Sequence, residues 1–163
     1  MRKTKKNNRG NFVEGVIISK MTEKDIDDVL TIESLSFSIP WSKEALRIET
    51  TENKLSIYLS ARIDKMVVGY AGMWKIFEEG HIMNIAVHPE YRGNGVGSML
   101  ISKLIKICPE NKIEKLTLEV RKSNVLALKM YEKFGFQIKG ERKNYYSDNG
   151  ESAIIMWLTK INC

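Results

Sequence analysis

A glycine-rich stretch, Arg92-Gly93-Asn94-Gly95-Val96-Gly97, has the residue types and spacing of a phosphate-binding loop. It lies between a strand-like apolar run, residues 82–87, and a helix-like run, residues 96–107. Glycines lack the Cβ atoms that keep a phosphate away from the backbone, and the first N–H groups of a helix point toward an anion. The stretch therefore predicts a phosphate-binding loop, although a glycine turn that only caps a helix also fits these residues.

Two other kinds of phosphate loop match this stretch poorly. A P-loop requires Gly-Lys followed by Ser or Thr, whereas Gly97 is followed by Ser98 and Met99. A dinucleotide-binding turn places its first glycine directly after the strand and its third glycine three residues beyond the second. Here five residues, 88–92, intervene, and Ser98 takes the third position. The pattern that does match is Gln/Arg-x-x-Gly-x-Gly/Ala.

A carboxylate and a phenol lie where they could transfer protons. In residues 118–121 Leu and Val alternate with Glu119 and Arg121, so a strand here turns Glu119 away from the core. The C-terminal ends of central strands are where α/β folds bind ligands. On the helix expected at 123–134, Tyr131 shares a face with Ala127. Taken singly, an exposed carboxylate and a core aromatic residue are the simpler interpretations.

The elements that must position these groups follow one another without a linker or repeat after the first eleven residues. We expect strands at 16–20, 55–62, 66–77, 82–87, 116–120, 136–145 and 153–159. One helix opens at Thr22 and is broken by residues 39–41; three more cover 42–52, 96–107 and 123–134. Glu33 falls on the apolar face of the first helix, where we expect it to be half-buried and paired. The order βααβββαβαββ predicts a three-layer α/β domain with a mixed sheet, antiparallel at its start and parallel in the middle.

The glycine loop and this order of elements resemble the acyl-CoA-dependent N-acetyltransferase (GNAT) superfamily across almost the whole chain after its first residues. Leu-Glu-Val-Arg-x-Ser-Asn at 118–124 and Tyr-Glu-x-x-Gly-Phe at 131–136 are similar to one branch, the bacterial ribosomal-protein-alanine N-terminal acetyltransferases. Pro-Trp-Ser at 40–42 and Asn-Tyr-Tyr at 144–146 strengthen the likeness. The resemblance implies acetyl-CoA as co-substrate and direct attack by an amine, without a covalent acyl-enzyme.

The resemblance also implies roles for individual residues. Glu119 matches a general base for the attacking ammonium, and Tyr131 a general acid for the departing thiolate. Cofactor contacts fall on Asn124, on the strand backbone at Ile85, Ala86 and Val87, and on the loop residues Arg92, Gly93, Asn94, Gly95, Val96, Gly97 and Ser98. The acceptor wall falls on Ile39, Pro40, Trp41, Tyr145 and Tyr146. Gly93 and Ser98 stand where the family often has long polar residues, which implies a lost phosphate contact but an intact backbone cradle.

Composition narrows the class of protein. A chain of 163 residues with 43% apolar content can bury a core without disulfides or metals. Two cysteines and two histidines without ligand spacing argue against a metal site, and Cys108 lacks a nearby histidine that would make it a nucleophile. Five of the six net positive charges fall within residues 2–9. We therefore expect a disordered basic tail at 1–11 and a single N-acetyltransferase domain at 12–163.

No membrane segment or secretory signal is apparent, which favours a reducing cytoplasm.

An N-terminal α-amine is the favoured acceptor. Its pKa of roughly 7.8 leaves about a quarter of it neutral near pH 7.4, whereas a lysine side chain is neutral about once in a thousand molecules. The sequence thus favours acetyl transfer to a protein N-terminus, by resemblance that of a small-subunit ribosomal protein with N-terminal alanine. Transfer to a lysine or small amine stays open, as does a ribosome- or RNA-binding protein with a degenerate CoA site. We expect no metal, no direct nucleic-acid binding, and a monomer or weak dimer.

Overall fold

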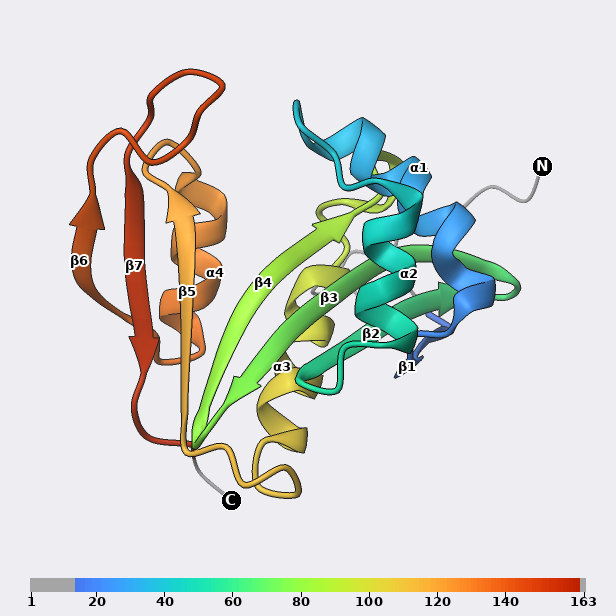
Figure 1. Cartoon of the computed structure of the whole chain (residues 1–163), viewed down its shortest axis with the longest axis horizontal. Helices are drawn as coiled ribbons and strands as arrows, with labels where there is room; N and C mark the ends of the chain where they lie inside the picture. Colours follow the sequence, from blue (N-terminus) through green and yellow to red (C-terminus); the bar gives the residue numbers. More distant parts are fainter. Residues whose placement is uncertain (1–13, 162–163) are drawn as a thin grey trace.

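One mixed sheet of seven strands, in the order β1-β2-β3-β4-β5-β7-β6, organises residues 14–161 in the computed structural model (Figure 1). The strands are β1 Val16–Lys20, β2 Ser56–Ile63, β3 Met66–Ile76, β4 Glu79–Val87, β5 Lys115–Arg121, β6 Gln137–Arg142 and β7 Ala153–Leu158. The helices are α1 Ile26–Ser36, α2 Lys43–Thr51, α3 Val96–Ile107 and α4 Val125–Lys133. Residues 1–13 and 162–163 lie outside the described residues, and with them the predicted tail at 1–11.

The element order predicted from the sequence is confirmed. Thr22 and Asp25 form a capping box before α1, and the Ser42 hydroxyl accepts a hydrogen bond from the Ala45 N–H at 3.1 Å at the start of α2. The strand predicted at 136–145 is shorter, because β6 ends at Arg142. The left-handed backbone of Asn144, with φ of 52°, turns the chain out of the sheet.

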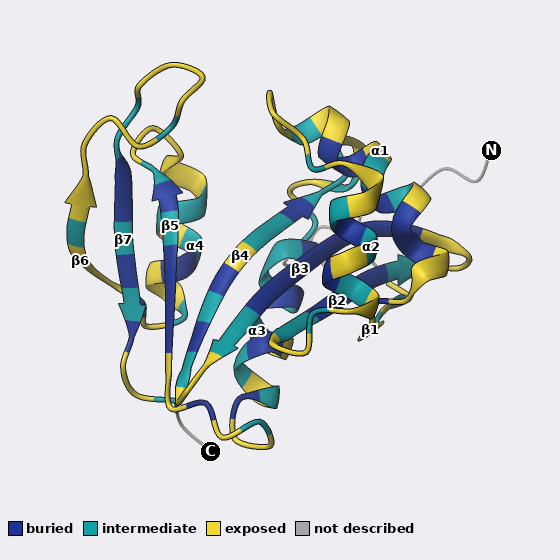
Figure 2. Cartoon of the chain, in the orientation of Figure 1, coloured by how far each residue is buried: buried dark blue, intermediate teal, exposed yellow. Residues whose placement is uncertain are grey.

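Two apolar clusters cover the two faces of the sheet. Buried side chains from α3 and α4 pack on one face; they include Leu100, Leu104, Tyr131 and the sheet residues Leu116 and Met156. On the other face, α1 and α2 bury a second set against β2, β3 and β4: Val29, Ile32, Leu46, Tyr58 and Tyr70. Figure 2 shows that burial is concentrated along β3 and the central strands, whereas β6 and much of α4 are exposed. Among residues 14–161, no helix is both long and apolar enough to cross a membrane.

The parallel pair β4 and β5 is joined over a short length. Residues 79–82 of β4 pair with residues 115–118 of β5, and within the described chain the pairing stops there. Past this point the two strands diverge (Figure 1), and β4 continues in register with β3 alone. The sheet therefore opens between two of its central strands.

A bulge in β4 decides which side chains face the two layers of helices. Gly72 pairs with Asn84 and Met73 with Ile82, so Met83 is an extra residue. Since strand side chains alternate, one extra residue exchanges the two faces beyond it. Ile82 and Ile85 both pack on the α3–α4 side, whereas Ala86 joins the α1–α2 cluster.

Candidate active site

A cavity of about 970 Å³ lies at the opening between β4 and β5. Its walls come from both strands, the glycine loop, α4, the segment after α1, and the loop between β6 and β7. All the predicted site residues line it except Pro40, Asn94 and Tyr145. Residues far apart in the sequence thus meet around one space.

The glycine loop has a backbone that few other residues would adopt. Gly93 and Gly95 have φ of 74° and 81°, in the left-handed region, and Gly95 is the N-cap residue, directly before the first residue of α3. Among the described residues, no side chain caps the first N–H groups of α3. A Cβ atom at Gly97 would lie 3.4 Å from Met130 Sδ, which leaves little room for a branched side chain. The loop therefore presents bare backbone at a helix N-terminus, the arrangement that fits a pyrophosphate.

Two polar side chains of the loop form hydrogen bonds within the protein. Arg92 Nε donates to the Val87 carbonyl at 2.9 Å, and its Nη2 donates to Ser36 Oγ at 2.9 Å. The Asn94 amide donates to the carbonyls of Tyr91 and Arg92 at 3.2 and 3.0 Å. These contacts hold the loop in shape, and a direct ligand contact from Arg92 or Asn94 stays a prediction.

The edge of β4 beside the opening is available for pairing. Residues 85–87 pair with β3 on one side, and no strand among residues 14–161 pairs with them on the other. An extended ligand arm can add to such an edge through main-chain hydrogen bonds. The edge and the glycine loop line the same cavity, so together they fit a ligand that joins a polar arm to a pyrophosphate.

Glu119 projects from β5 into the opening, on the face away from Leu118 and Val120. Its Oε1 forms an ion pair with Arg142 Nε at 2.8 Å, and its side chain is 27% exposed. A hydrogen bond with Glu119 raises the pKa of the Tyr145 hydroxyl to about 12. Arg142 is the last residue of β6, and Tyr145 lies in the loop between β6 and β7. Of these two partners of Glu119, Arg142 was not among the residues predicted from the sequence.

Tyr131 contributes a hydroxyl group from α4. The residue is 4% exposed, lines the cavity, and packs its ring 5.7 Å from that of Phe136. Burial raises the pKa of Tyr131 well above its ordinary value, so the hydroxyl keeps its proton. Its predicted role as a proton donor stays a prediction.

Cys108 is excluded as a nucleophile by its surroundings. The thiol is buried beneath α3, its Sγ donates to the Leu104 carbonyl at 3.1 Å, and burial raises its pKa to about 12. Within residues 14–161 no cluster of three or more His, Cys, Asp or Glu side chains could hold a metal ion.

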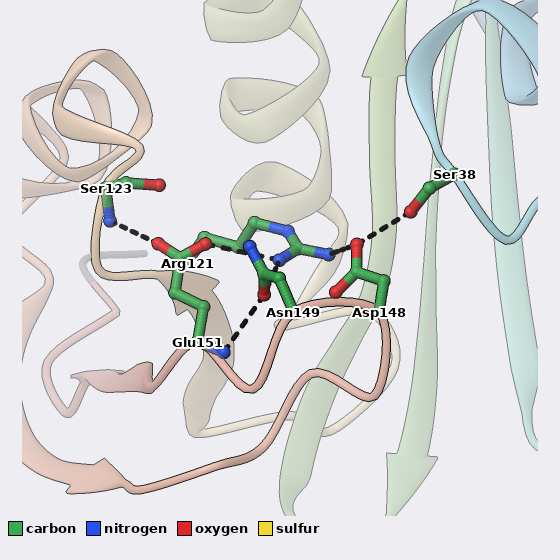
Figure 3. Close-up of polar contacts among 6 residues, drawn as sticks. All are labelled: Ser38, Arg121, Ser123, Asp148, Asn149 and Glu151. Carbon is green, nitrogen blue, oxygen red and sulfur yellow. Dashed lines mark hydrogen bonds and ion pairs between the residues drawn. The ribbon is translucent and has the colours of Figure 1, made fainter.

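A polar network that the sequence analysis missed forms one wall of the cavity (Figure 3). Arg121 Nη2 pairs with Asp148 Oδ2 at 2.7 Å, and Nη1 pairs with Glu151 Oε2 at 3.2 Å. The guanidinium also lies 3.9 Å from the centre of the Tyr146 ring. Arg121 thus fixes the loop between β6 and β7 against the end of β5.

Two further hydrogen bonds connect this network to the segment after α1 and to the residues before α4. Ser38 Oγ donates to Asp148 Oδ2 at 2.7 Å, which connects the segment after α1 to the loop between β6 and β7; both residues line the cavity. The Ser123 N–H donates to Glu151 Oε1 at 2.8 Å, just before Asn124 caps α4 through the Ala127 N–H at 3.2 Å. The predicted cofactor contact of Asn124 would therefore come from the rest of its amide group.

The family follows from comparison with known proteins. The acetyltransferase (GNAT) family model matches residues 26–136. A Bacillus subtilis protein provisionally named ribosomal protein bS18-alanine N-acetyltransferase is 44% identical over 142 residues, 87% of this chain and 94% of that protein. The Escherichia coli protein of that name is 33% identical over 143 residues, 86% of this chain and 95% of that one.

Solved structures agree. The crystal structure of ribosomal-protein-S18-alanine N-acetyltransferase from Escherichia coli matches with a TM-score of 0.82 and 30% identity, covering 91% of this chain and 95% of that one. PaiA N-acetyltransferase from Thermoplasma acidophilum, solved in complex with coenzyme A, shares the fold with a TM-score of 0.74 at 20% identity, over 88% of this chain and 98% of that one. The chain is therefore an acetyltransferase and belongs to the GNAT family.

Proposed function

We propose that this acetyltransferase modifies the N-terminal α-amine of a small-subunit ribosomal protein that begins with alanine. The observation that carries the proposal is the similarity to relatives named for ribosomal protein bS18-alanine, which extends over 94 to 96% of their lengths. Because this similarity spans nearly the whole of these relatives, it includes the segments on the acceptor side of the cavity. We assign the activity to one domain, residues 12–163.

The donor is acetyl-CoA, which the GNAT family uses. It supplies an acetyl group activated as a thioester. Gly93, Gly95 and the first N–H groups of α3 would hold its pyrophosphate, and the free edge of β4 at 85–87 would pair with its pantetheine arm. Asn124 lies on the opposite wall, at the start of α4.

Two side chains are proposed to move protons. Glu119 accepts a proton from the ammonium of the acceptor, since it is a carboxylate that faces the cavity and is held in place by Arg142. Tyr131 supplies a proton to the leaving group, since burial keeps its hydroxyl protonated. The Arg121 network and the residues Ile39, Trp41 and Tyr146 would shape the wall around the first residues of the acceptor.

A panel of acceptors tests the proposal. One peptide begins with a free alanine and contains no lysine, a second has a blocked N-terminus and one internal lysine, and a third probe is a small primary amine. We expect acetyl-CoA to be consumed with the first and not with the other two. Faster transfer to the blocked lysine peptide would contradict the proposed acceptor but not the family.

A further inference from the structure

Glu33 is a buried carboxyl group that the proposed reaction does not use. It lies on α1, is 0% exposed, and lines the cavity. Its Oε2 accepts a hydrogen bond from the Trp41 N–H at 2.9 Å, but Oε1 has no partner among residues 14–161. The expected half-burial was therefore wrong, because Glu33 is fully buried; it is paired with the Trp41 N–H through Oε2 alone, and Oε1 is left without a partner among these residues.

A second unbonded acceptor lies beside it. Asn84 extends from β4 on the α1 side, where its amide nitrogen lies 3.5 Å from the Tyr70 hydroxyl. Its Oδ1 is buried and likewise has no hydrogen-bond partner within the described chain. Asn84 faces this side because the extra residue Met83 exchanges the faces of β4. Both Glu33 and Asn84 line the same cavity.

Two buried acceptors without donors are costly to leave unmatched, and they restrict what can occupy the space beside them. An anion would be repelled by the carboxylate, and a carbonyl group has no hydrogen to donate. A primary ammonium has three N–H donors, a positive charge and no acceptor, so it matches both oxygens at once.

The charge around Glu33 strengthens this match. Burial raises the pKa of Glu33, and the Trp41 N–H and the Asn84 amide lower it only in part. Arg142 balances the charge of Glu119, whereas none of the ion pairs formed among residues 14–161 includes Glu33. A cation that enters the cavity therefore relieves the desolvation of this carboxylate.

We propose that Glu33 and Asn84 form the subsite that receives the ammonium group of the acceptor as it enters the cavity. The inference rests on the proposed function, because it names the part of the acceptor that binds there. In this proposal two carboxylates on one face of the sheet have different roles. Glu33, above β4, binds the ammonium, and Glu119, on β5, removes its proton.

The test compares Glu33→Gln with a matched control. Glu33→Gln keeps the volume and one oxygen for the Trp41 N–H, but replaces the free oxygen with an amide nitrogen. Glu49→Gln is the control, since Glu49 is also buried but its carboxylate is bonded to Trp74 Nε1 at 2.7 Å and to Asn53, and it does not line this cavity. The probes are an alanyl peptide and the same peptide with propionyl in place of alanyl, which lacks only the amine.

We expect Glu33→Gln to raise KM for the alanyl peptide by about 10- to 100-fold, the usual effect of a lost hydrogen bond to a charged group, with kcat within about threefold. KM for acetyl-CoA should stay unchanged. The wild type and Glu49→Gln should bind the alanyl peptide more tightly than the propionyl peptide, and Glu33→Gln should bind the two alike. Asn84→Ala leaves the contact between Glu33 and Trp41 in place and should raise the same KM by about 3- to 10-fold, so it carries the test if Glu33→Gln does not fold.

A wild-type KM and a retained preference for the amine in both variants would overturn the inference. A fall in kcat and in melting temperature with no change in KM would also overturn it, since that is the pattern of a purely structural residue. Failure of the proposed function is seen separately, in the wild type: it would not acetylate the alanyl peptide at all.

Discussion

The two halves of the sheet differ in how completely their helices and outer strands are buried. In the first half, β1 to β4 with α1 to α3, each of the three helices buries apolar residues completely, and the middle of β3 is buried without interruption. In the second half, β5 to β7 with α4, the helix buries Tyr131 alone and β6 is almost wholly exposed. In Figure 2 the contrast is confined to β6 and α4, because β5 and β7 are largely buried like β3.

Ion pairs add to apolar packing in the second half, where β5 and β7 still bury residues such as Leu116 and Met156. Arg121 joins Asp148 and Glu151, Arg142 joins Glu119, and Lys122 joins Glu141 at 3.2 Å. Because water screens partly exposed pairs such as these, they arrange the second half more than they stabilise it. In the proposed mechanism, the first half supplies the helix N-terminus and strand edge for the donor, and the second half supplies both proton-transfer groups.

The largest expected effect is on chemistry in the second half. Glu119→Gln should lower kcat by roughly 10² to 10⁴ because it removes only proton transfer. The affinity for CoA and the KM of the peptide should change little, in contrast to Glu33→Gln in the first half. Steady-state kinetics and calorimetry with CoA measure both effects.

A control separates the base from its ion pair. Arg142→Gln keeps the carboxylate and should lower kcat by less than about tenfold, as expected for a residue that only positions another. Full activity in Glu119→Gln would show that this carboxylate is not the base.

Next in size is a difference in stability between two helices on the same face of the sheet. Leu104 in α3 is 0% exposed, whereas Leu128 in α4 is only partly buried against the same cluster. Leu104→Ala should lower the free energy of unfolding by about 2 to 5 kcal/mol, the usual range for a fully buried leucine. Leu128→Ala should lower it by under about 1.5 kcal/mol, since less apolar area is lost. If urea titrations gave equal losses of unfolding free energy for the two variants, α3 and α4 would not differ in their contribution to stability.

The smallest effect concerns acid stability of the second half. Hydrogen bonds from the Ser123 side chain and N–H lower the pKa of Glu151 from 4.5 to about 2. A carboxyl group with a lowered pKa in the folded state stabilises it above its ordinary pKa, and this contribution is lost as the pH falls from about 4.5 toward 2. The melting temperature of Glu151→Gln should therefore lie below that of the wild type at pH about 6 and approach it at pH about 3. A constant difference at both pH values would show that the ionised form of Glu151 is not what matters.

Local patterns made the first half and the glycine loop predictable. The Thr22 capping box, the Ser42 cap and the αL glycines depend on neighbouring residues, so the sequence showed where the elements begin. The contacts of the second half join distant residues: Arg121 and Asp148 are 27 residues apart, and Ser38 and Asp148 are 110 apart. No short window of sequence contains such pairs.

The bulge at Met83 is a similar case on a smaller scale. The apolar run at 82–87 predicts a strand, but nothing in its composition marks the extra residue that turns Asn84 toward α1. Periodicity therefore predicts the strand and leaves the orientation of its polar side chain undetermined. That orientation is what places Asn84 beside Glu33.

The four-residue pairing of β4 with β5 has a mechanical consequence. When two rigid arms meet at a short joint, a small rotation there becomes a large displacement at their far ends. The joint is tightly packed: a Cβ atom added at Gly80 would lie 2.5 Å from Leu116 Cδ2, so Leu116 or β4 would have to shift. β4 ends at Val87 and β5 at Arg121, whose guanidinium holds Asp148, the residue that accepts the hydrogen bond from Ser38. A methyl group at Gly80 would change the separation of the far ends only if β4 moved, and not if Leu116 alone changed its rotamer.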